Sequence, residues 1–235
     1  MSALVDRIRP FLRSNTFFGG LPDGAVDALI GKGHTKRYPK GSPIYRRGES
    51  GDSLMVILSG RIKIFNTNAG AREVTLNFLG VGDLNGEIAA LDGRGRTADA
   101  LALEDCEVFT VYTRDLLPAL TAHPEAMLEI IKILCDKLRS ASAIIEDNTL
   151  EMRRRTARGL LRLSEQHGRM SKDGVRLELT VPQRELGSYL GISRANVSRE
   201  LGWLRDASVI KIDGTQITIT DEKGLAEIAS DPSRD

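Results

Sequence analysis

The segment from Val181 to Arg205, VPQRELGSYLGISRANVSRELGWLR, carries the pattern that most restricts how this chain can fold. Apolar residues recur at helical spacing on both sides of Gly191, which predicts two short helices: Leu186, Leu190, Ile192, Val197, Leu201 and Leu204. Gly191 can adopt the left-handed backbone of a tight turn, and the hydroxyl of Ser193 can cap the second helix. A helix presented in this way fits the major groove of DNA.

Charge is distributed unevenly along the 235 residues, although the net charge is only +1. Residues 1–150 contain 18 basic and 19 acidic residues, a net charge of −1. Residues 151–206 contain 12 basic and 7 acidic residues, a net charge of +5. The basic excess therefore lies in and just before the helix-turn-helix, where contacts to DNA phosphates would be made.

The two cysteines, Cys106 and Cys135, are far apart and have no metal-ligand spacing. The first thirty residues carry several charges and no long apolar run, so no signal peptide is expected. No segment approaches the roughly 20 apolar residues of a membrane span. We therefore expect a cytoplasmic protein with reduced thiols and no metal.

Short β-branched runs separated by glycines replace the helical pattern between residues 34 and 113. Six of them are predicted strands: Ser42–Tyr45, Leu54–Leu58, Ile62–Phe65, Glu73–Leu79, Ala98–Leu103 and Glu107–Tyr112. Regularly spaced short strands with turn residues between them predict an all-β barrel or sandwich. Two short helices, over 5–14 and 22–32, are expected to precede it.

A long helix is predicted from Pro124 to Leu150, roughly 40 Å in length. Its apolar residues alternate spacings of four and three, as in a coiled-coil seam: Met127, Ile131, Leu134, Leu138, Ala141 and Ile145. We favour a two-helix homodimer interface, because a two-fold reader of DNA needs one. The alternative is a helix packed on its own barrel.

The C-terminal pattern predicts a winged helix. A basic helix (Arg153–Gln166) and a strand (Val175–Thr180) precede the helix-turn-helix, and strands Val209–Ile212 and Gln216–Thr220 follow it around a turn at Asp213-Gly214-Thr215. The predicted fold is therefore α+β, with a jelly-roll-like β-roll (1–123), a dimerisation helix (124–150) and a winged helix-turn-helix (151–235).

Three segments together resemble the cyclic-AMP receptor / fumarate–nitrate regulator (CRP/FNR) family of bacterial transcription factors. GESGDSLMVILSGRIKI (Gly48–Ile64) is similar to the family's β-roll core, and GDLNGEIAALDGRGRTADALA (Gly82–Ala102) looks like its phosphate-binding cassette. The third segment is the helix-turn-helix. The resemblance implies a homodimeric, cyclic-nucleotide-responsive regulator that binds a palindromic operator and contacts RNA polymerase, with no catalytic activity.

The cassette residues also suit a cyclic nucleotide chemically. The planar fork of Arg96 and the hydroxyl of Thr97 can donate to the phosphate. Gly86 lets the backbone N–H groups of Glu87 and Ile88 approach the ligand closely. By resemblance, Glu87 accepts a hydrogen bond from the ribose hydroxyl. The alternative is a structural Glu87–Arg96 ion pair in an empty roll.

The base end of the ligand is less strongly specified. Family members that sense cyclic AMP use a Thr–Ser pair on the long helix, whereas the matching place here reads Ala141-Ser142, with Ser140 one residue earlier. Because the threonine is missing, cyclic GMP becomes a candidate beside cyclic AMP. Thr97 would then be a candidate partner for the exocyclic amine of guanine.

The second helix of the helix-turn-helix carries the residues expected to read DNA. Arg194 and Arg199 match the family's base-reading arginines, and Asn196 and Ser198 share their face. Ala195 stands where many relatives have a glutamate that accepts from cytosine, so we expect altered preference at the inner base of the site. Phosphate contacts or caps are expected from Ser193, Gln183 and Thr180.

Two other functions remain open from the sequence. The first is a regulator of the same family that is constitutive or responds to another effector. An iron–sulfur cluster is excluded, because it would need about four cysteine ligands and the chain has two cysteines. The second is a cupin-like enzyme, which would need clustered metal-binding histidines, whereas His34, His123 and His167 are scattered.

Overall fold

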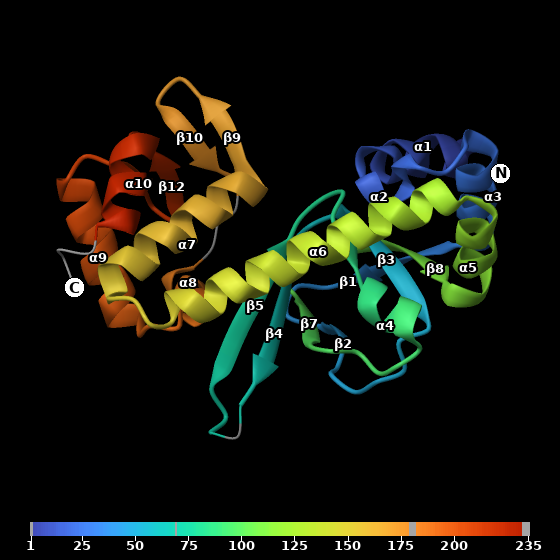
Figure 1. The fold of residues 1–235 in the computed structure, drawn as a ribbon, viewed down its shortest axis with the longest axis horizontal. Coiled ribbons are helices and arrows are strands. Elements are labelled where there is room, and N and C mark those ends of the chain that lie inside the picture. Colours follow the sequence, from blue (N-terminus) through green and yellow to red (C-terminus); the bar gives the residue numbers. More distant parts are fainter. Residues whose placement is uncertain (1, 69, 179–181, 232–235) are drawn as a thin grey trace. The chain divides into compact units, whose positions relative to one another are not determined.

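The computed structural model describes residues 2–68, 70–178 and 182–231 (Figure 1). The chain forms two compact units, one made of residues 1–72 and 76–138 and the other of residues 73–75 and 139–235. The boundary between residues 138 and 139 lies inside the long helix.

Two four-stranded sheets with the orders β1-β8-β3-β6 and β2-β7-β4-β5 form the β-roll. Their strands are β1 (His34–Tyr38), β2 (Pro43–Tyr45), β3 (Ser53–Ser59), β4 (Ile62–Thr67), β5 (Glu73–Leu79), β6 (Leu84–Asn85), β7 (Asp99–Ala102) and β8 (Cys106–Tyr112). The six predicted strands are confirmed to within two residues at each end. The strands β1 and β6 were not predicted, because HTKRY is mostly polar and β6 is only two residues long.

Strand β3 is apolar along almost its whole length because both of its faces are covered. Alternate residues point to opposite sides of a strand. Leu54, Val56 and Leu58 enter one core cluster, beneath the helices, while Met55 and Ile57 enter a second cluster between the two sheets. The continuous run SLMVILS is therefore the sequence of a central strand with two buried faces.

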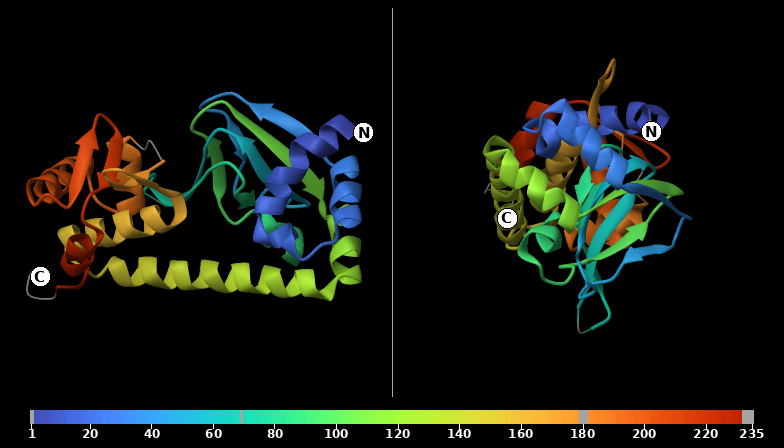
Figure 2. Two further views of the ribbon diagram at one scale, coloured as in Figure 1. Left: turned by 90° about the horizontal axis from the view of Figure 1, so that it is seen from above. Right: turned by 90° about the vertical axis from the view of Figure 1, so that its right-hand side faces the viewer.

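Helices cover the outer face of the sheet that contains β3. Figure 2 shows α1 (Ser2–Ser14), α2 (Thr16–Gly19) and α3 (Asp23–Lys32) in blue beside these strands. With α5 (Thr113–Ala122) they complete the first core cluster, in which Phe17 and Phe18 are fully buried. The sequence predicted α1 and α3 but not α2 or α5.

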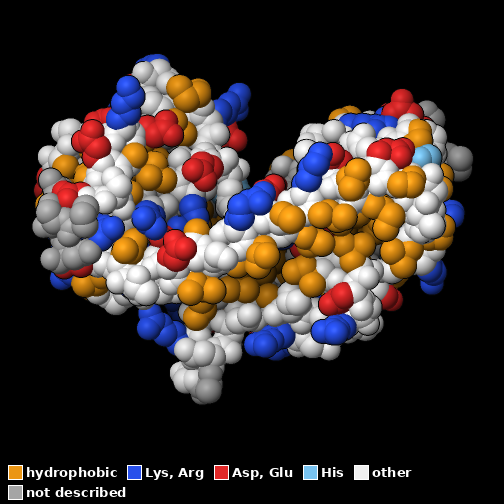
Figure 3. All heavy atoms as spheres, viewed as in Figure 1, with side chains coloured by type: hydrophobic (Ala, Val, Ile, Leu, Met, Phe, Trp, Pro, Cys, Tyr) orange, Lys and Arg blue, Asp and Glu red, His pale blue; other side chains and the backbone are white. Residues whose placement is uncertain are grey.

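Helix α6 (Pro124–Asp147) has apolar side chains on two sides within the roll unit. Ala126 and Ile130 are buried in the first core cluster, with Ile133 and Leu134 partly buried against it. Other apolar side chains of α6 stay exposed and form a band along the helix in Figure 3: Met127, Leu128, Ile131, Leu138 and Ile145. Of the predicted seam residues, Leu134 packs partly on the roll, whereas Met127, Ile131 and Leu138 are exposed in this unit. Ala141 and Ile145 belong to the second unit and are also exposed.

The second unit is a winged helix. It contains α7 (Met152–His167), β9 (Gly168–Ser171), β10 (Gly174–Leu177), α8 (Gln183–Leu190), α9 (Arg194–Asp206), β11 (Ile210–Asp213), β12 (Gln216–Ile219) and α10 (Glu222–Ser230). Its four strands form one antiparallel sheet of order β11-β12-β10-β9. Strand β9 and helix α10 were not predicted, and residues 179–180 of the predicted strand lie outside the described residues.

Helix α6 ends at Asp147, three residues before the predicted end, and arginines of α7 bind its last turn. The buried carboxylate of Asp147 accepts from Arg158 Nη1 at 3.0 Å and from Arg162 Nη1. Arg155 donates to the main-chain oxygens of Asp147, Asn148 and Leu150. These donors satisfy carbonyl groups that the end of a helix leaves without partners.

Candidate functional site

The predicted cassette is built around Gly86, between β6 and the short helix α4 (Glu87–Asp92). Gly86 has a φ of +84°, and a Cβ at this position would lie 2.1 Å from Nη1 of Arg96. Gly93 ends the helix with a φ of +71°. Glycine is therefore needed at Gly86 for two reasons, the left-handed backbone and the close approach of the arginine.

Arg96 is 4% exposed and lies against the backbone of this turn. Its Nη1 donates to the carbonyl oxygens of Ser53 (2.9 Å) and Gly86 (3.0 Å), and its Nη2 donates to the Ser53 hydroxyl (2.9 Å). The guanidinium also stacks over the Tyr45 ring, 4.6 Å from its centroid. Ser53 and Tyr45 were not identified from the sequence, because neither belongs to the cassette segment.

Glu87 is 3% exposed and pairs with a residue of the long helix. Its Oε1 accepts from Lys137 Nζ at 2.5 Å. Among the described residues, Glu87 thus pairs with Lys137, whereas Arg96 donates to Ser53 and Gly86. Sequence reasoning missed Lys137, although it precedes Ala141 by one helical turn, which was a usable signal.

The remaining nucleotide-site candidates are accessible to solvent. Ile88 and Thr97 are exposed at the cassette, and Ala141 and Ser142 are exposed on α6. The structure thus places Gly86 and Glu87 in one turn, with Arg96 bound to the carbonyl oxygen of Gly86.

The helix-turn-helix has the predicted geometry. Leu186, Leu190 and Val197 are buried, as are Ile192, Leu201 and Leu204. Gly191 has a φ of +69°, and the Ser193 hydroxyl caps α9 by accepting from the Asn196 N–H at 3.2 Å. Arg194, Ala195, Ser198 and Arg199 are exposed on α9, and Asn196 and Gln183, the first residue of α8, are half-buried. Thr180 lies outside the described residues.

A buried carboxylate orients one of the two predicted base-reading arginines. Glu200, whose side chain is 5% exposed, accepts from Arg199 Nε and Arg153 Nε, both at 3.2 Å. Arg153 also stacks on Trp203, 3.9 Å from the ring centroid. Sequence reasoning missed Glu200, whose signal was a charged residue on the otherwise apolar inner face of α9.

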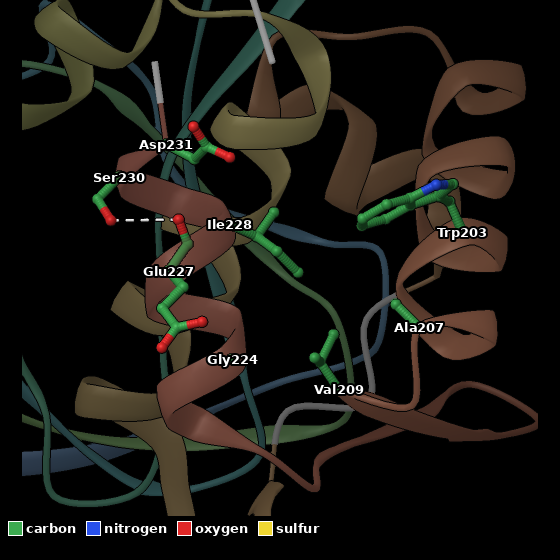
Figure 4. Close-up of a pocket in the computed structure, with 8 residues that line it drawn as sticks. All are labelled: Trp203, Ala207, Val209, Gly224, Glu227, Ile228, Ser230 and Asp231. Carbon is green, nitrogen blue, oxygen red and sulfur yellow. Dashed lines mark hydrogen bonds between the residues drawn. The ribbon is translucent and has the colours of Figure 1, made fainter. Parts of the chain in front are cut away.

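Figure 4 shows an open pocket of about 610 Å³ between α9 and α10, with Trp203 on one wall and Ile228 and Glu227 on the other. It lies away from the exposed arginines at the start of α9. Among the described residues no group of histidines, cysteines and carboxylates is placed to hold a metal ion. No described helix is long and apolar enough to cross a bilayer.

Comparisons with known proteins agree with this geometry. A model described as the cyclic nucleotide-binding domain matches residues 35–123, and a Crp-like helix-turn-helix domain matches residues 154–228. The cyclic AMP receptor protein of Thermus thermophilus is 31% identical over 219 residues, which cover 93% of this chain and 98% of that protein. A CRP-like cAMP-activated global transcriptional regulator of Mycobacterium tuberculosis is 26% identical over 213 residues, covering 90% and 95%.

A solved structure supports the fold. FixK2 from Bradyrhizobium japonicum matches with a TM-score of 0.76 at 20% identity, covering 85% of this chain and 98% of that one. The relatives named above are transcription regulators rather than enzymes, so the cupin-like enzyme alternative is rejected. Since the similarity runs through both domains of a relative at 31% identity, the chain belongs to the CRP family and is a cyclic-nucleotide-binding transcription regulator.

Proposed function

We propose that cyclic AMP or cyclic GMP binds in the cassette and switches a homodimer of this chain to a state that binds a palindromic operator. The observation that carries the proposal is the ion pair between buried Glu87 and Lys137. It connects the carboxylate proposed to hold the ribose with the helix proposed to form the dimer. A ligand that bound the DNA-competent state about 100-fold better would shift the equilibrium by roughly 2.7 kcal/mol.

The proposed ligand contacts follow from the free acceptors and donors of the cassette. Lys137 uses Oε1 of Glu87, so Oε2 can accept from the ribose 2′-hydroxyl. Arg96 and Thr97 donate to the phosphate, and the backbone N–H groups of Glu87 and Ile88 lie beside it. Ala141 and Ser142 face the base, and Ser142 is its polar partner.

Calorimetric titration of the ligand-free protein with cyclic AMP and, separately, cyclic GMP tests this assignment. We expect micromolar binding of at least one nucleotide, and the ratio of the two dissociation constants measures what Ala141 does to base selection. Ala141→Thr should shift that ratio toward cyclic AMP. An absence of heat with both nucleotides would refute nucleotide control and favour a constitutive regulator or another effector.

The exposed apolar side of α6 is the proposed dimer interface. Ile131, Leu138 and Ile145 are each more than half exposed, which is unusual for large apolar residues clustered on one helix. Leu138→Glu should convert a dimer to a monomer in light-scattering measurements. Met170→Glu is a matched control, because Met170 is 78% exposed on β9 and is no part of this surface. A monomeric wild-type protein would contradict the proposal.

In the proposed DNA complex, the two α9 helices of the dimer enter major grooves about 34 Å apart. Arg194 and Arg199 read guanines, each worth roughly 1–3 kcal/mol, with Asn196 and Ser198 beside them on α9. Ser193 and Gln183 contact phosphates. RNA polymerase is the expected protein partner.

Band-shift assays with single-base operator variants test this assignment. Because Ala195 cannot accept from cytosine, discrimination should be strong at the outer bases and weak at the inner base. Equal discrimination at both positions would contradict the assignment of Ala195. Arg199→Ala should abolish specific DNA binding and leave nucleotide affinity unchanged.

A further inference from the structure

The protein itself occupies only part of the hydrogen-bonding capacity of Arg96. A guanidinium has five N–H groups. Three of them point to Ser53 O, Ser53 Oγ and Gly86 O, and all three bonds are between 2.9 and 3.0 Å. Both Nη1 hydrogens and one Nη2 hydrogen are therefore used, which leaves the Nε hydrogen and the second Nη2 hydrogen.

Because Nη1 and Nη2 both donate to Ser53, we assign one hydrogen of each to that residue, which leaves an Nη2 hydrogen on the same edge as the Nε hydrogen. Nε is buried and has no hydrogen-bond partner among the described residues. An unpaired buried donor is unfavourable unless an acceptor reaches it. Two parallel N–H groups on one edge match two oxygens of a phosphate, so this edge has the geometry of an anion-binding fork.

Tyr45 packs its ring against one face of the Arg96 guanidinium, and a hydrogen bond to Asn85 fixes the ring. Its ring lies 4.6 Å from the central carbon of the Arg96 guanidinium, within the range of a cation–π contact. Its hydroxyl donates to Asn85 Oδ1 at 2.7 Å, and both residues are buried. Since Tyr45 pairs with Ala100 in one sheet and Asn85 with Met55 in the other, this hydrogen bond joins the two sheets.

The contacts from Arg96 to Tyr45 and from Tyr45 to Asn85 lead back to Arg96, because Asn85 directly precedes Gly86, whose carbonyl oxygen accepts from Arg96. We propose that Tyr45 and Ser53 are positioning residues for nucleotide binding: they fix Arg96 so that its Nε/Nη2 edge faces the phosphate, and Asn85 fixes Tyr45. This inference rests on the proposed binding of a cyclic nucleotide in the cassette. It assigns a role to residues outside the cassette segment.

The test measures the affinity of purified full-length variants for the cyclic nucleotide that the wild type binds more tightly. Tyr45→Leu removes the supporting ring and should weaken binding by about tenfold, and Ser53→Ala, which removes one acceptor, should weaken it by about threefold. Tyr45→Phe keeps the ring but loses the hydroxyl, so its affinity for the nucleotide should lie between those of the wild type and Tyr45→Leu. Tyr38→Leu is the matched control, because Tyr38 is equally buried in the same core and its ring contacts Lys36 where that of Tyr45 contacts Arg96.

A second measurement separates positioning from general loosening of the roll. The Rp and Sp phosphorothioates of the nucleotide carry sulfur in place of one or the other exocyclic phosphate oxygen. Wild type should discriminate between them, because a fixed fork contacts defined oxygens. Tyr45→Leu and Ser53→Ala should bring the affinity ratio toward one, whereas Tyr38→Leu should not. In an Arg96→Lys background, which lacks the fork, Ser53→Ala should have no further effect.

The outcomes are distinguishable. A wild-type protein that binds neither cyclic AMP nor cyclic GMP removes the proposed function and this inference with it. If the wild type binds a nucleotide and the variants bind it more weakly, but the ratio of the Rp and Sp affinities does not change, only the positioning role is overturned. Unchanged affinity in Tyr45→Leu and Ser53→Ala overturns it as well.

Discussion

The carboxylate of Asp147 should be among the groups whose loss most destabilises the winged-helix unit. Its side chain is 3% exposed and accepts hydrogen bonds from Arg158 and Arg162 of α7. Asp147→Asn keeps the size of the side chain and removes the charge. It also places an amide N–H, which is a donor, against one of two guanidinium groups that are themselves donors only.

The magnitude follows from the burial of the three groups. Removing one partner of a buried ion pair costs about 3–5 kcal/mol. Because the Arg158 side chain is 35% exposed, water can solvate it in the variant, and we expect the lower end, about 3 kcal/mol. With a urea dependence of about 1–3 kcal/mol per molar, the unfolding midpoint should fall by roughly 1–3 M.

The chain has a single tryptophan, and it reports on this unit. Trp203 lies on α9, beneath Arg153, so its fluorescence follows unfolding of the winged helix in urea. Glu146→Gln is the matched control, because Glu146 precedes Asp147 and its side chain is exposed. The free energy of unfolding of this variant should differ from that of the wild type by less than about 0.5 kcal/mol. If Asp147→Asn unfolded at the wild-type urea concentration, the reasoning about the buried cluster would be refuted.

Three further predictions concern other residues. Lys137→Met leaves the buried Glu87 carboxylate without its cation and should destabilise the roll by about 1–3 kcal/mol. Circular dichroism should show this loss, whereas the unfolding midpoint followed by Trp203 fluorescence should not change. Burial raises the pKa of Tyr45 to about 12, so the folded state favours the neutral phenol. The protonated phenol therefore contributes its full stabilisation of the fold below pH 10, the pKa of tyrosine in the unfolded chain. Between pH 10 and 12 the free energy of unfolding should fall by about 2–3 kcal/mol, and this loss should be absent in Tyr45→Phe. Glu200→Gln should weaken operator binding through Arg199 at unchanged nucleotide affinity, which a band shift and a titration would measure.

Periodic patterns were sufficient to predict much of the fold. The helix-turn-helix was predicted fully, because its six apolar residues, Gly191 and Ser193 each act locally. Short elements such as β6 and α4 were missed, since two to six residues are too few for a period to show. Helix α10 was also missed, although Leu225, Ile228 and Ala229 have helical spacing and are buried.

The sequence singled out Gly86, Glu87 and Arg96, which the structure brings together, but it did not predict the contacts that hold them. Gly86, Glu87 and Arg96 lie within eleven residues of one another, and the resemblance to a cassette was enough to find them. Lys137 is 50 residues from Glu87, and their contact depends on how α6 packs on the roll. Contacts of this kind arise from tertiary packing, which no local pattern encodes.

The hydrogen bond between Tyr45 and Asn85 has an evolutionary consequence. Replacing one member of a buried polar pair leaves the other unpaired, whereas replacing both with apolar residues of similar shape is nearly neutral. These positions are 40 residues apart in the chain. We therefore expect them to be inherited as a unit, so that descendants of this sequence carry either both polar residues or two hydrophobic ones.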